Sequence, residues 1–447
     1  MNKEPSLTMD LPKSTSPTVW TEDRVRRLLT EEHFSYQRIS LPYNLHTEGK
    51  DRSATCRKIL PDDLTGKTVL DVGSYNGYFC FEALKRGAKS ALGFELHADR
   101  LRKAKLLAEC LGSPAEFRAA DVEREPIDGQ FDYVLCLNVL HHLRNPLAAL
   151  QKLIAVTREK LILEVAALGG RERRKIKLPW TSGWILNRSP ILFVSQRELP
   201  TRDYGQRFFI TAAAIKNLLL LHGNMFASVN ILPSDRKGRF IAVAYKRQID
   251  KLLVVAGPSS AGKSTLIRRL RRGELPQIEE LIGFSLSGVR VASGRNLPRL
   301  REAQLDRLIF HYDFLRPRWR SACIYERDEA LDILDCANEV TFVTIWTPPD
   351  VLLRQFEQDE PPPGGKRLVA WKIRRHNIVH ERYRNPANVY SFYKDWFGFC
   401  RARPGKHVVV SFEGGLQFYS PDEWEQRFGQ AARSEESQNL DLSAGSR

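Results

Sequence analysis

The chain has 447 residues, of which 42% are hydrophobic and 10% aromatic, so it is long enough for two or three domains with substantial cores. Its formal net charge is +16, with most of the basic excess in the first half. That charge fits a polyanionic partner such as RNA, a nucleotide-linked sugar or an anionic lipid, and equally an ordinary basic surface. The seven cysteines are scattered and form no C-x-x-C pair, which predicts buried free thiols. No run of 18 apolar residues occurs, so we expect no membrane span. Because the N-terminal segment is not apolar, we also expect no secretory signal and a cytoplasmic protein.

Residues 1–65 are expected to form an N-terminal extension and a helical cap. Ser, Thr and Pro dominate the first 19 positions, which predicts a loose segment. A helix is expected after Thr21, because threonine followed by acidic residues is a typical helix start. The stretch 41–59 should cover the cofactor of the following domain. Its Lys50 and Arg52 could contact an anionic acceptor, but we favour surface charges.

Residues 66–248 alternate between short apolar runs and helix-like segments. Apolar runs buried on both faces are typical of a parallel sheet covered by helices. The last two runs flank a turn, so the sheet should end in an antiparallel hairpin. We expect strands at 67–73, 90–96, 115–122, 131–140, 159–168, 226–233 and 239–247, and helices at 76–88, 98–112, 145–157 and 211–223.

A glycine loop, DVGSYNG at 71–77, follows the first of these strands and precedes a helix. Gly73 and Gly77 allow the backbone to approach a ligand at the helix N-terminus. Glu95, which closes the next strand, is placed to accept hydrogen bonds from a ribose diol. Asp71 would repel a pyrophosphate and attract an ammonium group. This disfavours the alternative of a NAD-binding domain.

The loop resembles the D-x-G-x-G-x-G loop of class I S-adenosylmethionine-dependent methyltransferases, except that Tyr75 stands at the central glycine. The resemblance covers about residues 60–248. It implies a seven-stranded Rossmann-like sheet in which the 71–77 loop holds the methionine part of the cofactor. It further implies that Glu95 holds the ribose and that Asp121 lies beside the adenine.

Three further segments, 131–153, 161–165 and 210–223, are similar to the branch that contains the tRNA wobble-uridine carboxymethyltransferases. Members of this branch also occur in polysaccharide and secondary-metabolite pathways. The resemblance therefore implies alkyl transfer from adenosylmethionine or a relative, without fixing the acceptor. We expect plain methyl transfer.

Three polar residues, Asn138, His141 and His142, follow the fourth strand at the edge of the expected cleft. Methyl transfer is an in-line displacement, so the enzyme mainly aligns the acceptor and removes its proton. Either histidine could be the base, because imidazole titrates near neutrality. The alternative is that one histidine caps backbone groups and the other packs in the core.

The basic stretch 171–208 interleaves cations with aromatic rings. This composition suits a nucleic acid or a sugar phosphate, and also a lid with aromatic anchors. We favour the lid, because acceptor recognition usually lies here in this fold. The residues concerned are Arg171, Arg173, Arg174, Lys175, Lys177, Trp180, Trp184 and Tyr204.

Residues 249–428 should form a second doubly wound α/β domain with a parallel sheet, followed by a disordered tail at 429–447. The segment GPSSAGKS at 257–264 fits G-x-x-x-x-G-K-[ST], follows an apolar strand at 251–257 and opens a helix. Further strands are expected at 307–313, 339–346 and 406–414.

This second loop resembles that of small P-loop kinases such as guanylate kinases. Its backbone N–H groups should wrap the phosphates of ATP, with Lys263 on the β/γ oxygens and Ser264 on Mg²⁺. Asp313 is expected to be the second metal-side group, or else a helix cap. The nucleotide-binding residues would be Gly257, Ser259, Ser260, Ala261, Gly262, Lys263, Ser264 and Thr265. Lid arginines and lysines, or an exposed basic helix, would be formed by Lys366, Arg367, Arg374 and Arg375.

We therefore expect a bifunctional enzyme that combines S-adenosylmethionine-dependent methyl transfer with ATP-dependent phosphoryl transfer to a small-molecule or glycan acceptor. Two alternatives stay open: a tRNA-modifying methyltransferase with an NTPase module, and a nucleotide-gated, non-catalytic interaction protein.

Overall fold

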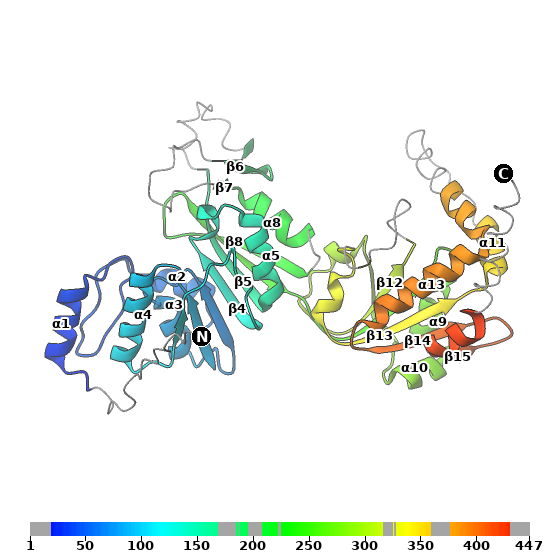
Figure 1. Cartoon of the computed structure of the whole chain (residues 1–447), viewed down its shortest axis with the longest axis horizontal. Helices are drawn as coiled ribbons and strands as arrows, with labels where there is room; N and C mark the ends of the chain where they lie inside the picture. The colour runs from blue at the N-terminus through cyan, green and yellow to red at the C-terminus, as the bar shows by residue number, and fades with distance from the viewer. Residues whose placement is uncertain are drawn as a thin grey trace, which may run out of the picture.

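The computed structural model describes residues 19–168, 185–186, 188–194, 208–221, 225–315, 325, 328–358 and 376–429. The first half of the chain forms a seven-stranded sheet and the second half a six-stranded sheet, each with its own covering helices (Figure 1). The α/β class predicted from the sequence is confirmed for both.

The first sheet has the strand order β3-β2-β1-β4-β5-β9-β8. The five strands from β3 to β5 are parallel, whereas β9 runs antiparallel to β5 and β8 antiparallel to β9. The predicted terminal hairpin is thus confirmed. The strands are β1 (Thr68–Val72), β2 (Ser90–Phe94), β3 (Glu116–Arg118), β4 (Phe131–Leu137), β5 (Thr157–Ala166), β8 (Phe226–Pro233) and β9 (Arg239–Lys246).

Helices cover both faces of this sheet because side chains alternate between faces along a strand. Val69 of β1 packs in one core cluster and the adjacent Leu70 in the other. Thr21 accepts a hydrogen bond from Arg24 N at 3.4 Å and begins the first helix, as predicted. The helical elements are α1 (Glu22–Glu32), α2 (Ser53–Ile59), α3 (Tyr78–Lys85), α4 (Ala98–Leu111), η1 (Leu140–His142), α5 (Pro146–Val156) and α8 (Ala212–Leu221).

Two short strands, for which the sequence gives no expectation, lie within and at the end of the basic stretch 171–208. Strands β6 (Leu192–Val194) and β7 (Phe208–Ile210) pair antiparallel. Three residues are too few to show an alternating pattern, so the sequence gives no signal for them.

The second sheet has the order β11-β12-β10-β13-β14-β15. Five strands are parallel, but β15 pairs antiparallel with β14, so the prediction of a parallel sheet is wrong at this edge. Gly414 and Gly415, with φ of 72° and 118°, lie in the turn that reverses the chain there. The strands are β10 (Gln248–Gly257), β11 (Arg290–Ser293), β12 (Gln304–Asp313), β13 (Ala337–Trp346), β14 (Lys406–Ser411) and β15 (Gln417–Tyr419).

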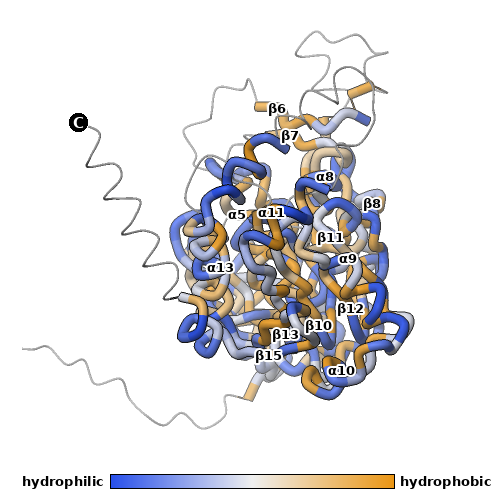
Figure 2. The backbone as a smooth tube through the Cα atoms, turned by 90° about the vertical axis from the view of Figure 1, so that its right-hand side faces the viewer, coloured by the Kyte–Doolittle hydropathy of each residue, from blue (hydrophilic) through white to orange (hydrophobic). Residues whose placement is uncertain are grey.

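The central strands of this sheet, β10, β12 and β13, run through the interior as hydrophobic segments (Figure 2). Their covering helices include a long one whose Trp396 is fully buried and stacks with Tyr312 at 5.2 Å between ring centroids. The helical elements are α9 (Lys263–Arg271), α10 (Pro276–Ile282), η2 (Leu297–Arg299), η4 (Asp332–Cys336), α11 (Pro349–Gln358) and α13 (Pro386–Arg401).

A single residue, Arg247, lies between β9 and β10. Its side chain is buried and donates from Nη2 to Leu297 O at 3.0 Å, while its backbone N donates to Met225 O at 2.7 Å. Gln248 N donates to Ala303 O at 2.6 Å. The amino-terminal ends of the parallel strands in both sheets therefore lie on the side of this short, hydrogen-bonded joint.

Within the described residues, no helix is long and apolar enough to cross a membrane, and no group of three or more His, Cys, Asp or Glu side chains could hold a metal ion. Six cysteines are free and buried, as predicted, and burial raises the pKa of each thiol. The seventh, Cys323, lies outside the described residues.

Candidate functional site

The 71–77 loop lies at the carboxyl end of β1, directly before α3. Strands β2 and β3 lie on one side of β1, and β4 and β5 lie on the other, so the strand order reverses at β1. Ligands of parallel α/β sheets bind at such a point. Gly73 and Gly77 have φ of 76° and 89°. A Cβ at these two positions would lie 2.3 Å from a side-chain carbon of Val139 and of Phe117, respectively, so neighbouring side chains also require the glycines.

Tyr75 occupies the position of the missing central glycine with a left-handed φ of 57°. This conformation is unfavourable for a residue with a Cβ. Its ring stacks on Tyr36, with 4.4 Å between centroids, and the Arg100 guanidinium lies 4.5 Å from the ring centroid. Its backbone N donates to Glu95 Oε2 at 3.0 Å. These contacts stabilise Tyr75 at the position where the family pattern has glycine.

Asp71 is buried, and its Oδ2 has no hydrogen-bond partner among the described residues. Burial, with a smaller contribution from the nearby Glu95 carboxylate, raises the pKa of Asp71 to about 7, although the Arg52 charge lowers it. Two more buried loop atoms, Ser74 Oγ and Asn76 Oδ1, also lack partners there. Buried polar atoms are normally paired, so these atoms are available to a ligand that donates hydrogen bonds.

Glu95 and Asp121 follow β2 and β3, as predicted. Glu95 is buried and accepts hydrogen bonds from Tyr75 N and His97 N, both at 3.0 Å. Asp121 is half-buried and accepts from Glu123 N at 2.9 Å. Both carboxylates are held rigidly at the carboxyl ends of their strands, where the resemblance implies ribose and adenine contacts.

Glu164, at the carboxyl end of β5, is fully buried and was not predicted as a site residue. It accepts hydrogen bonds from Arg52 Nη2 at 2.7 Å, from Asn138 Nδ2 at 2.5 Å and from the Ser234 hydroxyl. A carboxylate inside the apolar run LILEVAAL is the signal that could have identified it, because an unpaired charge is rarely buried. Arg52 is therefore buried and paired, rather than a surface charge.

Arg239 connects two of the three predicted site residues in the turn after β4. Its Nη1 donates to Asn138 Oδ1 and lies 2.9 Å from His141 Nε2. His141 is fully buried, and this burial lowers its pKa well below the usual value, with His142 and Arg239 lowering it further. A guanidinium only donates, so His141 is neutral and uses its Nε2 lone pair on Arg239. Of the two predicted bases, half-buried His142 is the better placed to accept a proton.

Arg52 and Arg239 both interact with the Glu164 carboxylate, and Arg236 lies close to Arg239. Arg236 donates from Nη1 to the Tyr36 hydroxyl at 2.6 Å and lies 4.7 Å from its ring centroid. The charges of Arg236 and Arg52 lower the pKa of partly buried Arg239, although its burial is the larger cause. The Asp71 and Asp235 carboxylates also interact electrostatically with Arg52. The guanidinium groups of Arg236 and Arg239 can orient an anionic group beside the glycine loop.

The predicted lid of the first domain, with Arg171, Arg173, Arg174, Lys175, Lys177, Trp180, Trp184 and Tyr204, lies outside the described residues. The same holds for Lys366, Arg367, Arg374 and Arg375 of the second domain. Predicted contact residue Lys50 is exposed.

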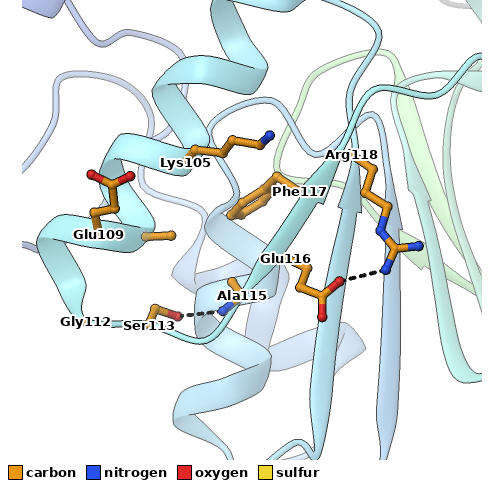
Figure 3. Close-up of a pocket in the computed structure, with 9 residues that line it drawn as sticks. Lys105, Glu109, Gly112, Ser113, Ala115, Glu116, Phe117 and Arg118 are labelled. Carbon is orange, nitrogen blue, oxygen red and sulfur yellow. Dashed lines mark hydrogen bonds and ion pairs between the residues drawn. The ribbon is translucent and has the colours of Figure 1, made fainter. Parts of the chain in front are cut away.

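A shallow pocket at the outer edge of the first sheet, between α4 and β3, contains none of the predicted site residues (Figure 3). Lys105, Glu116 and Arg118 line it, and Glu116 pairs with Arg118 at 2.8 Å. Phe117 also lines it, and the same ring lies against Gly77 and Gly93. Phe117 therefore connects the wall of this pocket to Gly77 of the glycine loop.

The second predicted loop, 257–264, connects β10 to α9. Gly257 pairs in register with Asp313 of β12, so this carboxylate lies beside the loop, as predicted. Asp313 accepts from the Ser259 hydroxyl at 2.6 Å and from Leu315 N at 3.1 Å. It thus both contacts the loop and caps the following turn.

Lys263 is buried at the start of α9, and its Nζ donates to Gly257 O at 2.9 Å and to Pro258 O. Ser260 and Gly262 have positive φ of 64° and 83°, which curves the loop. Ser264 and Thr265 are exposed at the helix start, and Ala261 is buried. The predicted residues are thus brought together at a strand end and a helix N-terminus.

Comparison with known proteins bears on the first half of the chain. Residues 63–173 match the family model described as a methyltransferase domain. A tRNA U34 carboxymethyltransferase of Campylobacter hominis is 37% identical over 92 residues, 20% of this chain and 32% of that protein. One from Idiomarina loihiensis is 34% identical over 117 residues, 25% of this chain and 36% of that protein. The chain thus spans about a third of the length of these relatives.

Among solved structures, the N-terminal domain of EvdMO1 with SAH bound aligns with 51% of this chain and 98% of its own, at 22% identity and a TM-score of 0.37. The family match, together with the seven-stranded order and terminal hairpin, bears out the resemblance stated from the glycine loop. The first half of the chain carries a class I methyltransferase domain with tRNA U34 carboxymethyltransferases among its relatives.

Proposed function

We propose that the first half of the chain binds S-adenosylmethionine at the 71–77 loop and transfers its methyl group. The observation that carries this proposal is the buried Asp71 Oδ2, which lacks a partner among the described residues at the loop where α3 begins. An ammonium group would pair with this carboxylate, Glu95 would hold the ribose and Asp121 would lie by the adenine. When bound, the cofactor supplies a methyl group on a sulfonium centre.

The acceptor would enter beside Asn138 and the cationic cluster of Arg52, Arg236 and Arg239. These cations can orient an anionic group on the acceptor, and His142 is the candidate to take its proton. A small molecule or a glycan is our first choice of acceptor. A tRNA is the second candidate acceptor, because relatives at 34–37% identity are tRNA U34 carboxymethyltransferases.

We also propose that the second half binds ATP with Mg²⁺ at the 257–264 loop and transfers its terminal phosphoryl group. Buried Lys263, held on the carbonyl of Gly257, and Asp313, paired with Gly257 across the sheet, support this assignment. Lys263 would move from the carbonyl to the phosphates, and Ser264 with Asp313 would face the metal.

Labelled methyl transfer tests the first proposal. The purified chain is incubated with S-[methyl-³H]adenosylmethionine and either bulk tRNA or a small-molecule extract, and the label is followed in each. Label in the extract supports the leading proposal, and label in tRNA supports the second. If S-adenosylhomocysteine binds but no acceptor is labelled, the result favours the alternative of a nucleotide-gated, non-catalytic interaction protein. If S-adenosylhomocysteine does not bind, the cofactor proposal is wrong.

ATP turnover tests the second proposal. Lys263→Ala should abolish hydrolysis or transfer of the terminal phosphate, because it removes the cation that would reach the β/γ oxygens. Arg268→Ala, an exposed position on the same helix, is the matched control and should retain activity. Equal activity in both variants would contradict the assignment.

A further inference from the structure

Gln37, in the segment before α2, reaches the cofactor loop from a distant part of the chain. Its side chain is buried. Its Nε2 donates to Ser74 O at 3.4 Å, and its Oε1 accepts from Asn76 N at 3.1 Å and from Tyr78 N at 3.5 Å. Asn76 Nδ2 donates back to Ser35 O at 3.0 Å. The two amide side chains thus tie the loop and the N-terminal segment together reciprocally.

The segment that carries Gln37 is itself firmly held. Thr47 Oγ1 donates to Gln37 O at 2.7 Å and accepts from Ile39 N at 2.8 Å. Gly49 lies so close that a Cβ there would be 2.5 Å from Gln37 N. Residues 36–50 therefore form a compact loop that is held together by hydrogen bonds, hereafter the N-terminal loop. The position of this loop fixes the Gln37 amide.

The contacts of Gln37 fall on the groups that an anionic ligand would use. Tyr78 is the first residue of α3, and the N–H groups at a helix N-terminus bind phosphates in dinucleotide-binding loops. Here the Gln37 oxygen already accepts from Asn76 N and Tyr78 N. The loop atoms left without a described partner are acceptors or hydroxyls, namely Asp71 Oδ2, Asn76 Oδ1 and Ser74 Oγ.

We propose that Gln37 is a positioning and specificity-determining residue of the cofactor site. Its amide closes the α3 N-terminus to a pyrophosphate and holds the 71–77 loop in the shape that presents Asp71 to a cationic ligand. The Tyr36–Tyr75 stack, next to Gln37, adds to this hold by packing the left-handed Tyr75 against the N-terminal loop. This inference rests on the proposed cofactor.

The test uses the full chain, S-adenosylhomocysteine and NAD⁺ as probes in calorimetry, and hydrogen exchange of the unliganded protein. Gln37→Met keeps the volume of the side chain and removes its hydrogen bonds, whereas Gln37→Glu keeps the acceptor. Tyr43→Phe is the matched control, because it removes a hydrogen bond to Trp20 O from the middle of the same N-terminal loop.

We expect Gln37→Met to weaken S-adenosylhomocysteine binding about tenfold or more and to speed exchange of the Asn76 and Tyr78 amides. Gln37→Glu should restore the slow exchange, and Tyr43→Phe should change neither quantity. The wild type should not bind NAD⁺. Unchanged amide exchange and cofactor affinity in Gln37→Met would overturn the inference. If the wild type does not bind S-adenosylhomocysteine, the proposed function fails, while the exchange data still decide whether Gln37 fixes the loop.

Discussion

The buried Asp71 carboxylate predicts that cofactor binding depends on pH in a defined direction. Burial holds its pKa at about 7 in the free protein. Pairing with an ammonium group requires the ionised form, so binding must first remove the proton below pH 7. The apparent dissociation constant for S-adenosylhomocysteine should therefore fall about tenfold between pH 6 and pH 8, and about half a proton should be released per ligand at pH 7.

The same carboxylate predicts an effect on stability. Its pKa of about 7 in the folded chain lies above the ordinary value of 3.8, so the folded state binds the proton more tightly than the unfolded state. Stability from this group is therefore lost as pH rises from about 4 to 7, and at pH 8 ionised Asp71 costs roughly 4 kcal/mol. Asp71→Asn removes that charge and should raise the free energy of unfolding of the ligand-free chain at pH 8.

Calorimetry in buffers of different ionisation enthalpy measures both affinity and proton release, and urea unfolding at pH 6 and 8 measures stability. Asp71→Asn should weaken binding at pH 8 and abolish its pH dependence. Asp62→Asn, an exposed position nine residues earlier in the chain, is the control and should behave as wild type. A dissociation constant that does not change with pH in the wild type, or an Asp71→Asn chain that keeps the full dependence, would refute the reasoning.

Two further substitutions probe the scaffold of the site. Glu164→Gln should lower the free energy of unfolding by about 3–5 kcal/mol in urea titrations, because it leaves buried guanidinium charge uncompensated. Glu159 is more exposed, so Glu159→Gln should lower the free energy of unfolding by about 1 kcal/mol or less. Equal losses in the two variants would contradict the role of burial. Gly77→Ala should abolish S-adenosylhomocysteine binding, because its Cβ would lie 2.3 Å from the Phe117 ring. Gly112→Ala has the same left-handed strain without a clash and should still bind; an additional Phe117→Ala change should restore binding to the Gly77→Ala chain.

The local patterns of the sequence were sufficient to predict the first sheet. Each expected strand and helix of residues 66–248 is present, because long apolar runs and helix-ending glycines are local signals. The two edge strands of the second sheet, β11 and β15, went unpredicted because four and three residues carry no periodicity.

The glycine loops and the carboxylates Glu95, Asp121 and Asp313 were also placed correctly from local order, since parallel strands bring their carboxyl ends to one edge. The partners of these groups were not predictable. Arg52 meets Glu164 across 112 positions of sequence, and only the fold shows that this arginine is buried. Gln37 gave no signal at all, because an isolated glutamine in a loop resembles any solvated side chain.

The joint at Arg247 has a consequence for any substance that both halves modify. Strand β9 starts at the carboxyl edge of β5 and leaves from the opposite edge directly into β10, which ends at the second loop. Residues 239–257 thus run as one nearly continuous extended ribbon from the first site toward the second, up to about 60 Å at 3.3 Å per residue. The two proposed sites lie at opposite ends of this ribbon, so a small metabolite that both halves modify would have to leave one site and diffuse through solvent to the other.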